Sequence, residues 1–391
     1  MLTVIKFGGS SLADAAKIDN AANIAAGRYK RGEKLVVVVS AQGDTTDRLL
    51  AKAKEICPAP SKRELDALLS AGEQISMSLM AMKLISTGIP AVSLCGWQAG
   101  ILTSAEHGDA RITDVSAARI EKELSEGKIV VAAGFQGIDK SGDVTTVGRG
   151  GSDTTAAALA AALSADSCVI YTDVKGVYTA DPRIVPNAIL QKEIDYDDML
   201  SLSSLGAGVL HDRSVETAKR ANVVLKVASS FEEGSGTDIK RLSPKNGRLC
   251  GVAADKDVSL ITLTGIAAGD ADKLLRSLAE NGITSDMMTV SGGSLSFSVP
   301  ESKADEAEKI ISEKLPGVKI SLRKDGLSKI SLVGSISSGG RRYAAELKER
   351  IQKGNVPAFS LFSGEMRISV LVPRDRADNT LREVHEEFFE K

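Results

Sequence analysis

The chain has 391 residues, a formal net charge of −2 and 43% hydrophobic residues, values typical of a globular protein with two or three domains. It has no long basic stretch and no apolar run of about 18 residues, so we expect no nucleic-acid partner and no membrane span. An apolar strand begins almost at once, so we expect no N-terminal leader and a cytoplasmic location. The four widely spaced cysteines are predicted to be reduced core residues, not metal ligands or disulfides.

The first predicted strand, Met1–Phe7, carries Lys6 near its end and runs into a tight glycine turn at Gly8 and Gly9. Residues 12–28 then have helical spacing. A strand, a lysine-flanked glycine turn and a helix are how α/β proteins bind phosphate groups. The turn is not a Walker A loop, because Gly-x-x-x-x-Gly-Lys-Ser/Thr is absent. Taken alone, it is equally well explained as a simple connection.

Apolar strands alternate with helices over the first 240 residues. Continuous apolar runs are typical of strands that are buried on both faces, and the alternation favours a mostly parallel sheet covered by helices on both sides. Ligands are then expected at the carboxyl ends of the strands. The further strands are predicted at 35–39, 129–133, 168–172 and 223–227, and the helices at 62–84, 116–126, 154–163 and 215–221.

The most distinctive segment, 148–158, reads Gly-Arg-Gly-Gly-Ser-Asp-Thr-Thr-Ala-Ala-Ala. It places Arg149 and several glycines before an alanine-rich helix, with Ser152 and Asp153 predicted as capping residues. The N-terminus of a helix offers unpaired N–H groups and the positive end of its dipole. Arg149 adds a planar fork that suits a carboxylate or a phosphate. The segment is therefore predicted to bind an anion.

The composition changes after about residue 231, where 232–236 and 243–247 are predicted to be connectors. Two similar segments of about 70 residues follow, which indicates a degenerate internal repeat. Each predicts a small ferredoxin-like α+β module. The first has elements at 259–265, 270–281, 284–290, 294–299 and 302–315, and the second at 328–334, 341–354, 358–362, 366–372 and 375–388.

Five motifs, in this order along the chain, resemble those of the aspartokinases, which join an amino-acid kinase fold to two ACT domains. They are Lys6–Ser11, Ser40–Asp47, Ser70–Glu73, Gly148–Asp153 and Tyr171–Pro186. The resemblance covers the whole chain. It implies a three-layer α/β catalytic domain at 1–242, a first ACT domain at 256–322, and a second one formed by 249–255 together with 326–391.

The resemblance also implies a reaction. The β-carboxylate of L-aspartate would be phosphorylated by ATP with Mg²⁺, giving 4-phospho-L-aspartate on the route to lysine, threonine and methionine. A carboxylate is already ionised near pH 7, so no general base is required. Catalysis then depends on positioning and on neutralising the charge of the transferred phosphoryl group.

Specific residues receive roles from the resemblance. Lys6 would contact the phosphates, Arg149 would hold the α-carboxylate of aspartate, and Glu73 its ammonium. The predicted catalytic residues are Lys6 and Asp153, and the predicted aspartate-binding residues are Ser40, Thr46, Glu73, Arg149 and Ser152. The predicted ATP-binding residues are Lys6, Phe7, Gly8, Gly9, Ser10, Thr172, Asp173, Tyr178, Asp181, Arg183 and Lys226.

Plainer interpretations stand beside these roles. Glu73 is also explained as an early-helix residue that stabilises the dipole, and Asp173 and Asp181 as turn residues. Tyr178 is as well explained by packing in the core. Lys175 adds a positive charge at a position where relatives carry a small or acidic residue. The methionines at 77, 80 and 82 are predicted to lie in the core.

The ACT loops at 267–270 and 335–340 lack the proline that is common in such loops. An effector site for lysine or threonine is still expected at Gly269, Asp270, Asp286 and Ser291. The alternative is a pair of modules that only holds subunits together. ACT modules commonly pair across subunits, so we expect a homodimer or a higher homo-oligomer.

Three other functions share some of these sequence features. A kinase for acetylglutamate, glutamate or carbamate would share the glycine turns, but such enzymes generally lack the tandem repeat. A non-catalytic amino-acid sensor would not need Lys6, Glu73, Arg149 and Asp153 together. A fused homoserine dehydrogenase is not expected within these residues, because no further dinucleotide-binding unit follows the repeat.

Overall fold

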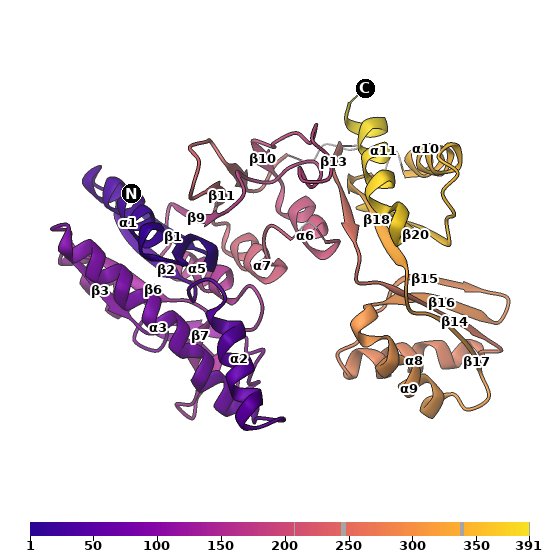
Figure 1. Cartoon of the computed structure of the whole chain (residues 1–391), viewed down its shortest axis with the longest axis horizontal. Coiled ribbons are helices and arrows are strands. Elements are labelled where there is room, and N and C mark those ends of the chain that lie inside the picture. The colour runs from indigo at the N-terminus through magenta and orange to yellow at the C-terminus, as the bar shows by residue number, and fades with distance from the viewer. Residues whose placement is uncertain (207, 244–247, 337–339, 391) are drawn as a thin grey trace. The chain divides into compact units, whose positions relative to one another are not determined.

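The computed structural model describes residues 1–206, 208–243, 248–336 and 340–390, which form two compact units (Figure 1). The N-terminal unit contains residues 1–177, 190–203 and 208–242. The C-terminal unit contains residues 178–189 and 204–206 together with the chain from residue 243 onwards. In the described residues, no helix is both long and apolar enough to cross a membrane.

An eight-stranded sheet forms the centre of the N-terminal unit, in the order β10-β12-β11-β9-β1-β2-β6-β3. All neighbouring pairs are parallel except β11 with β12. Phe7 pairs with both Val39 and Tyr171, so the carboxyl ends of the central strands are level. The strands are β1 (Leu2–Phe7), β2 (Lys34–Val39), β3 (Ala91–Leu94), β6 (Ile129–Ala133), β9 (Ser167–Thr172), β10 (Glu193–Ile194), β11 (Leu225–Ser229) and β12 (Thr237–Ile239).

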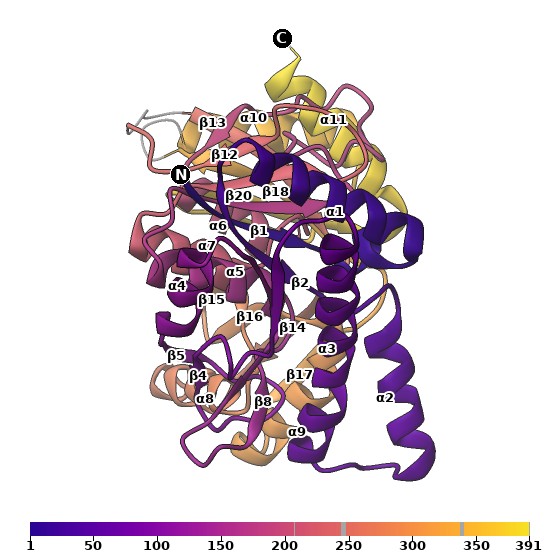
Figure 2. The same cartoon turned by 90° about the vertical axis from the view of Figure 1, so that its left-hand side faces the viewer.

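Helices cover both faces of this sheet, as the alternation in the sequence predicts (Figure 2). α1 (Ala15–Lys30) and α3 (Lys62–Ser86) pack in one apolar core with alternate side chains of the central strands, such as Ile5 and Val37. α4 (Ala118–Ser125) and α5 (Gly151–Ala162) contact the strands from the other side, and α7 (Asp212–Ala221) packs on α5. Burial on both faces explains the continuous apolar runs of the central strands.

A second, small sheet in the N-terminal unit was not predicted from the sequence. Its order is β5-β4-β7-β8, and α3 packs against β8. Its strands are β4 (Ile101–Thr103), β5 (Ile112–Val115), β7 (Gln136–Ile138) and β8 (Val144–Thr146). Strands of three or four residues are too short to show a periodic pattern. α2 (Thr45–Ile56) and α6 (Tyr196–Ser204) were also not predicted.

The C-terminal unit contains two four-stranded antiparallel sheets, each with two helices. The sheet β15-β16-β14-β17 packs with α8 and α9, and the sheet β13-β18-β20-β19 packs with α10 and α11. The first module has β14 (Ser259–Thr264), α8 (Ala268–Glu280), β15 (Asp286–Ser291), β16 (Ser294–Val299), α9 (Ala304–Lys314) and β17 (Lys319–Arg323). The second has β13 (Arg248–Asp255), β18 (Leu327–Ser335), α10 (Gly340–Lys353), β19 (Ser360–Ser363), β20 (Arg367–Pro373) and α11 (Ala377–Phe389).

Three details differ from the sequence-based expectations. The range 1–242 is interrupted, because Ala180 and Val185 are buried in the core of the second module. Met82 is 64% exposed, whereas Met77 and Met80 are buried. Cys57 is exposed, and the other three cysteines are buried. Cys57 follows directly after the short amphipathic helix α2, and nothing in the sequence distinguishes such an exposed residue from a core residue.

Candidate active site

The carboxyl edge of the large sheet brings together Lys6 and Asp153. Lys6 is the penultimate residue of β1, and Asp153 lies in the first turn of α5, which packs over β1. The Lys6 Nζ atom is 2.6 Å from Asp153 Oδ1, and Lys6 is only 8% exposed. A buried ammonium is held here by one carboxylate at the sheet edge where ligands of α/β proteins bind.

The turns that follow β1 and β2 touch one another, and a glycine makes this contact possible. A Cβ atom on Gly9 would lie 2.7 Å from the carbonyl oxygen of Ala41, so any other residue would force the two turns apart. The Gly43 amide donates to the carbonyl oxygen of Gly9 over 3.0 Å. The glycine turn is therefore tied to the residues after β2.

Glu73 is the most perturbed carboxylate of the site. It is 3% exposed; its Oε1 accepts a hydrogen bond from the Ala41 amide at 2.9 Å, and its Oε2 is buried without a hydrogen-bond partner among the described residues. Burial raises the pKa of Glu73 to about 7, against a smaller lowering effect of the Ala41 amide. Its interpretation as an early-helix residue is wrong, because α3 begins three turns earlier at Lys62.

The segment around Arg149 is shaped by glycines in left-handed conformations, with φ of +77° at Gly148 and +66° at Gly150. α5 begins at Gly151, with Gly150 as its N-cap. The prediction that Ser152 and Asp153 cap the helix is therefore wrong, because both lie inside its first turn. Ser152 packs directly against Gly134, where a Cβ would lie 2.8 Å from the Ser152 Oγ atom. Arg149 is exposed.

The other predicted aspartate-binding residues lie on the loops after the strands. Ser40 directly follows β2 and is half-buried, and its amide donates to Phe7 O over 3.2 Å. Thr46 is the second residue of α2, and Ser10 is exposed in a short 3₁₀ helix at Gly9–Leu12. The Ala41 amide and Gly134 could not be predicted from the sequence, because a backbone donor and a tight packing contact have no motif of their own.

The predicted nucleotide residues are divided between the two units. Phe7 is fully buried and stacks on Tyr171 with the ring centroids 5.0 Å apart, so its side chain belongs to the core. Thr172 donates to Asp173 over 3.0 Å at the end of β9, and Lys226 pairs with Asp238 at 3.5 Å. The remaining three lie in the C-terminal unit: Tyr178, Asp181 and Arg183. Lys175 forms an ion pair of 2.7 Å with Glu232.

Asp286 connects the two modules of the C-terminal unit. It belongs to β15 of the first sheet, its Oδ2 lies 3.1 Å from the Lys329 ammonium of β18, and it forms an ion pair with Arg367 of β20. Its pKa is lowered by these two cations, against the opposing effect of burial.

The other predicted effector residues show no such link. Gly269 and Ser291 are exposed, and Asp270 pairs with Lys273 on its own helix at 3.4 Å. Residues 337–339 of the second predicted ACT loop lie outside the described residues.

One group in the described part of the chain has the proximity of metal ligands. Single ligand atoms of His107, Asp139 and Asp143 lie within 4.8 Å of one another. Protein groups already contact all three: Asp66 contacts His107 Nδ1 at 2.9 Å, Arg63 donates to Asp143 at 2.6 Å, and Asp139 Oδ1 accepts from the Ser141 amide at 2.8 Å. The group lies in the small sheet and its loop, not beside Lys6.

Comparison with known proteins shows the family to which the chain belongs. The model of the amino acid kinase family matches residues 1–229. The aspartokinase of Corynebacterium glutamicum is 44% identical over 99% of this chain and 96% of its own length, and aspartokinase 2 of Bacillus subtilis is 42% identical over 99% and 97%. The chain belongs to the aspartokinase family. It is an aspartate kinase, which uses ATP to phosphorylate aspartate.

Solved aspartokinase structures agree with this assignment. E. coli aspartokinase III in complex with aspartate and ADP, called the R-state, superposes with a TM-score of 0.86 at 25% identity over 100% of both chains. The same enzyme in complex with lysine and aspartate, called the T-state, gives a TM-score of 0.78 over 99% of both chains. The expected α/β kinase fold with additional small antiparallel sheets is thereby confirmed. The sensor without kinase activity and the kinases for other amino acids are not supported.

Proposed function

We propose that this aspartokinase transfers the γ-phosphoryl group of ATP to the β-carboxylate of L-aspartate and releases 4-phospho-L-aspartate and ADP. One β-carboxylate oxygen attacks the γ-phosphorus, and the bond to the bridging oxygen of ADP breaks. No proton has to be removed from the nucleophile, because the carboxylate is ionised near pH 7. The product enters the route to lysine, threonine and methionine, in the cytoplasm.

The observation that carries the proposal is the buried Glu73 carboxylate. One of its oxygens has no hydrogen-bond partner among the described residues. Burial disfavours the ionised carboxylate and thereby raises its pKa. A bound cation relieves this cost. The ammonium of aspartate is such a cation, with Arg149 holding the α-carboxylate and Ser40, Thr46 and Ser152 completing the site. Neither N-acetylated amino acids nor carbamate offer that ammonium.

Charge neutralisation is assigned to Lys6 and the glycine turn. Lys6 reaches the transferring phosphates, where its charge stabilises the transition state, and the amides of Gly8 and Gly9 donate to phosphate oxygens. Asp153, 2.6 Å from the Lys6 ammonium, orients it. Within the N-terminal unit, ATP is assigned to Thr172 and Asp173, with Lys226 and Ser10 as further contacts.

Mg²⁺ accompanies ATP in this proposal and offsets the phosphate charge. The residues fit an ion that is held mainly by phosphates and water. The carboxylate beside Lys6, Asp153, is already engaged as an ion-pair partner, while Ser10 and Ser40 offer neutral hydroxyls at the same edge.

The reaction is tested by trapping the acyl phosphate with hydroxylamine. L-Aspartate, L-glutamate, N-acetyl-L-aspartate and N-acetyl-L-glutamate are compared with Mg-ATP. Hydroxamate is expected from L-aspartate, with little from the two acetylated compounds, which lack the ammonium. Equal rates for aspartate and its acetylated form would remove Glu73 from the proposed role.

We further propose feedback control by lysine or threonine through the two small modules, in a homodimer or higher homo-oligomer. Support comes from Asp286, which joins the sheets of both modules through Lys329 and Arg367. An effector ammonium that competes for Asp286 changes this link. Inhibition by lysine and threonine is measured in wild type and in Asp286→Asn. Unchanged inhibition in the variant argues against a role for Asp286.

A further inference from the structure

One face of helix α3 carries a row of polar residues toward the candidate aspartate site. Arg63, Asp66, Ser70 and Glu73 follow one another at intervals of three, four and three, which places them on the same side of the helix. The first three contact the small sheet and its loop, and the fourth is the buried carboxylate of the site. The row connects two parts of the chain that are far apart in sequence.

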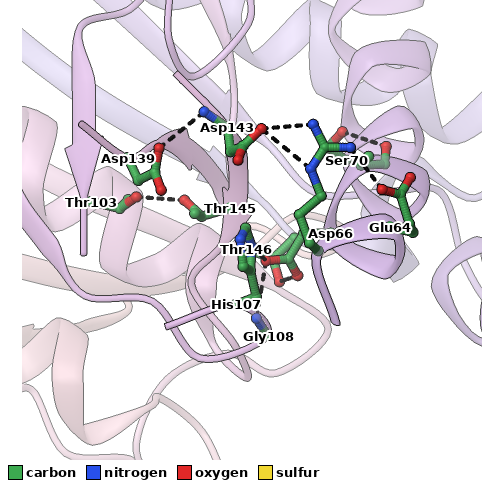
Figure 3. A network of polar contacts seen from close by, with 12 residues as sticks. Glu64, Asp66, Ser70, Thr103, His107, Gly108, Asp139, Asp143, Thr145 and Thr146 are labelled. Carbon is green, nitrogen blue, oxygen red and sulfur yellow. Dashed lines mark hydrogen bonds and ion pairs between the residues drawn. The ribbon is translucent and has the colours of Figure 1, made fainter. Parts of the chain in front are cut away.

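Asp66 is the centre of this row (Figure 3). It is fully buried and has three partners: the Thr146 hydroxyl donates to Oδ1 at 2.5 Å, the Gly108 amide donates to Oδ2 at 3.0 Å, and His107 Nδ1 lies 2.9 Å from Oδ2. A carboxylate that is fully buried and bound by several donors is expensive to disturb, because each donor would be left unpaired. Asp66 therefore fixes α3 to both β8 and the loop before β5.

The neighbouring contacts on the helix reinforce this connection. Arg63 donates to Asp143 at 2.6 Å, one residue before β8, and Gln136 of β7 donates to the Ser70 carbonyl at 2.8 Å. Figure 3 shows Ser70 and Asp143 near Asp66. α3 is thus held to the small sheet and its loop one turn before Asp66 and one turn after it.

Two of the partners of Asp66, Thr146 and Gly108, lie close to the Arg149 segment. Thr146 precedes Arg149 by three residues on the same segment. Gly108 precedes Asp109, and Asp109 packs so closely on Gly148 that a Cβ there would lie 2.6 Å from its Oδ1 atom. Arg213 holds this arrangement by donating to Asp109 at 2.9 Å and to the Val147 carbonyl at 3.2 Å. The position of the Arg149 segment relative to α3 thus depends on Asp66.

We propose that Asp66 is a positioning residue for the aspartate site. It sets the separation between Glu73 on α3 and Arg149 after β8, the two residues assigned to the ammonium and the α-carboxylate. The inference rests on those proposed roles. A displacement of about 1 Å between two groups that grip one substrate is enough to weaken its binding severalfold or more. ATP is assigned to other residues, so its binding should be insensitive to Asp66.

The test is Asp66→Asn, which keeps the shape but replaces one acceptor by an NH₂ group facing other donors. We expect the KM for aspartate to rise about tenfold or more, with the KM for ATP nearly unchanged. Glu123→Gln is the matched control, because Glu123 is also buried. It accepts from Arg119 of α4 and from Lys128, the residue before β6, both at 2.6 Å. Glu123→Gln should lower thermal stability, but it should not raise the KM for aspartate more than the KM for ATP.

A double-mutant cycle distinguishes positioning from a general structural role. If Asp66 acts through Arg149, the increases in aspartate KM caused by Asp66→Asn and Arg149→Ala should not be additive. Thr146→Val removes only one of the donors to Asp66, so it should raise the aspartate KM by a smaller factor than Asp66→Asn does. Thr146→Val is also the variant to use if Asp66→Asn does not fold.

Two results overturn the proposal: equal changes of both KM values in Asp66→Asn, or an unchanged aspartate KM in Thr146→Val. A different result would contradict the roles assigned to Glu73 and Arg149 themselves: normal aspartate KM values in Glu73→Gln and Arg149→Ala.

Discussion

The Lys6 ammonium and the Asp153 carboxylate lie 2.6 Å apart, and so join the end of β1 to the first turn of α5. Lys6 is 8% exposed, so its charge is positioned before any substrate arrives. Asp153 also sits where the helix dipole favours a negative charge. A cation that is already desolvated and oriented needs little reorganisation when charge develops on a phosphoryl group.

Lys6→Met should reduce kcat by about 10² to 10³-fold, because it removes a charge that acts mainly in the transition state. The KM for aspartate should change far less. Steady-state kinetics with varied aspartate and ATP measures both quantities. Lys83→Met is the control, because Lys83 pairs with Asp19 at 2.7 Å at the far end of α3. A Lys6→Met enzyme with normal kcat would contradict the assignment.

Aspartate binding should depend on pH through Glu73. The pKa of this carboxyl is about 7 in the free protein, so below that pH it is neutral and must lose a proton before it can pair with an ammonium. The KM for aspartate should therefore fall as pH rises from about 6 to about 8, approaching tenfold per unit at the acid end. Glu73→Gln should raise the KM and flatten this profile.

The same pKa predicts an effect on stability. The folded-state pKa lies above the ordinary glutamate value of 4.5, so the neutral carboxyl contributes stability that is complete below about pH 4.5 and lost as pH rises through about 7. The Tm of the free enzyme should fall over this window more than that of Glu73→Gln. Aspartate should restore more stability at about pH 8 than at about pH 6. Parallel Tm profiles of both proteins would speak against the buried ion.

The sequence predicted the central strands of the large sheet because they are buried on both faces, as in Leu35–Val39, where every residue is apolar. The shorter strands β3, β10 and β12 of the same sheet were not predicted. It also placed Lys6 and Arg149 in the right kind of surroundings, since a glycine turn and a glycine-rich helix start have a physical signature. The repeat after residue 250 was visible because each copy keeps an amphipathic helix between alternating strands.

What the sequence could not show depends on contacts between distant residues. Asp66 looks like any polar residue of an amphipathic helix, and its burial depends on a hydroxyl 80 positions away at Thr146. The unpaired oxygen of Glu73 likewise depends on how α3 meets Ala41. Residues 178–189 read as a continuation of the kinase domain, yet Val185 is buried with the second module. Tertiary packing decided each of these cases.

Arg149→Ala should raise the KM for aspartate much more than the KM for ATP, because its planar fork is assigned to the α-carboxylate. Loss of a bidentate charge-assisted contact corresponds to about a tenfold to hundredfold rise. Arg31→Ala, at an exposed arginine just after α1, is the control and should leave both KM values unchanged. Equal increases for both substrates would move Arg149 to the phosphates.

The close packing of Ser152 on Gly134 predicts that a single methyl group disturbs the site. In Gly134→Ala the new Cβ would lie 2.8 Å from the Ser152 Cβ and Oγ atoms, so the start of α5 must shift. We expect a loss of about 1–3 kcal/mol in the free energy of unfolding and a lower kcat/KM for aspartate.

Gly27→Ala provides the contrast for this substitution. It lies inside α1, where the nearest atom to a new Cβ is the Arg31 Nη1 atom at 3.8 Å. This variant should be more stable by about 0.5–1 kcal/mol, because alanine favours the helix, and its activity should be unchanged. Denaturant unfolding and aspartate kinetics on both variants decide the matter. If Gly134→Ala retains full stability and activity, the first turn of α5 is free to move, and the preorganised position of Asp153 beside Lys6 loses its structural basis.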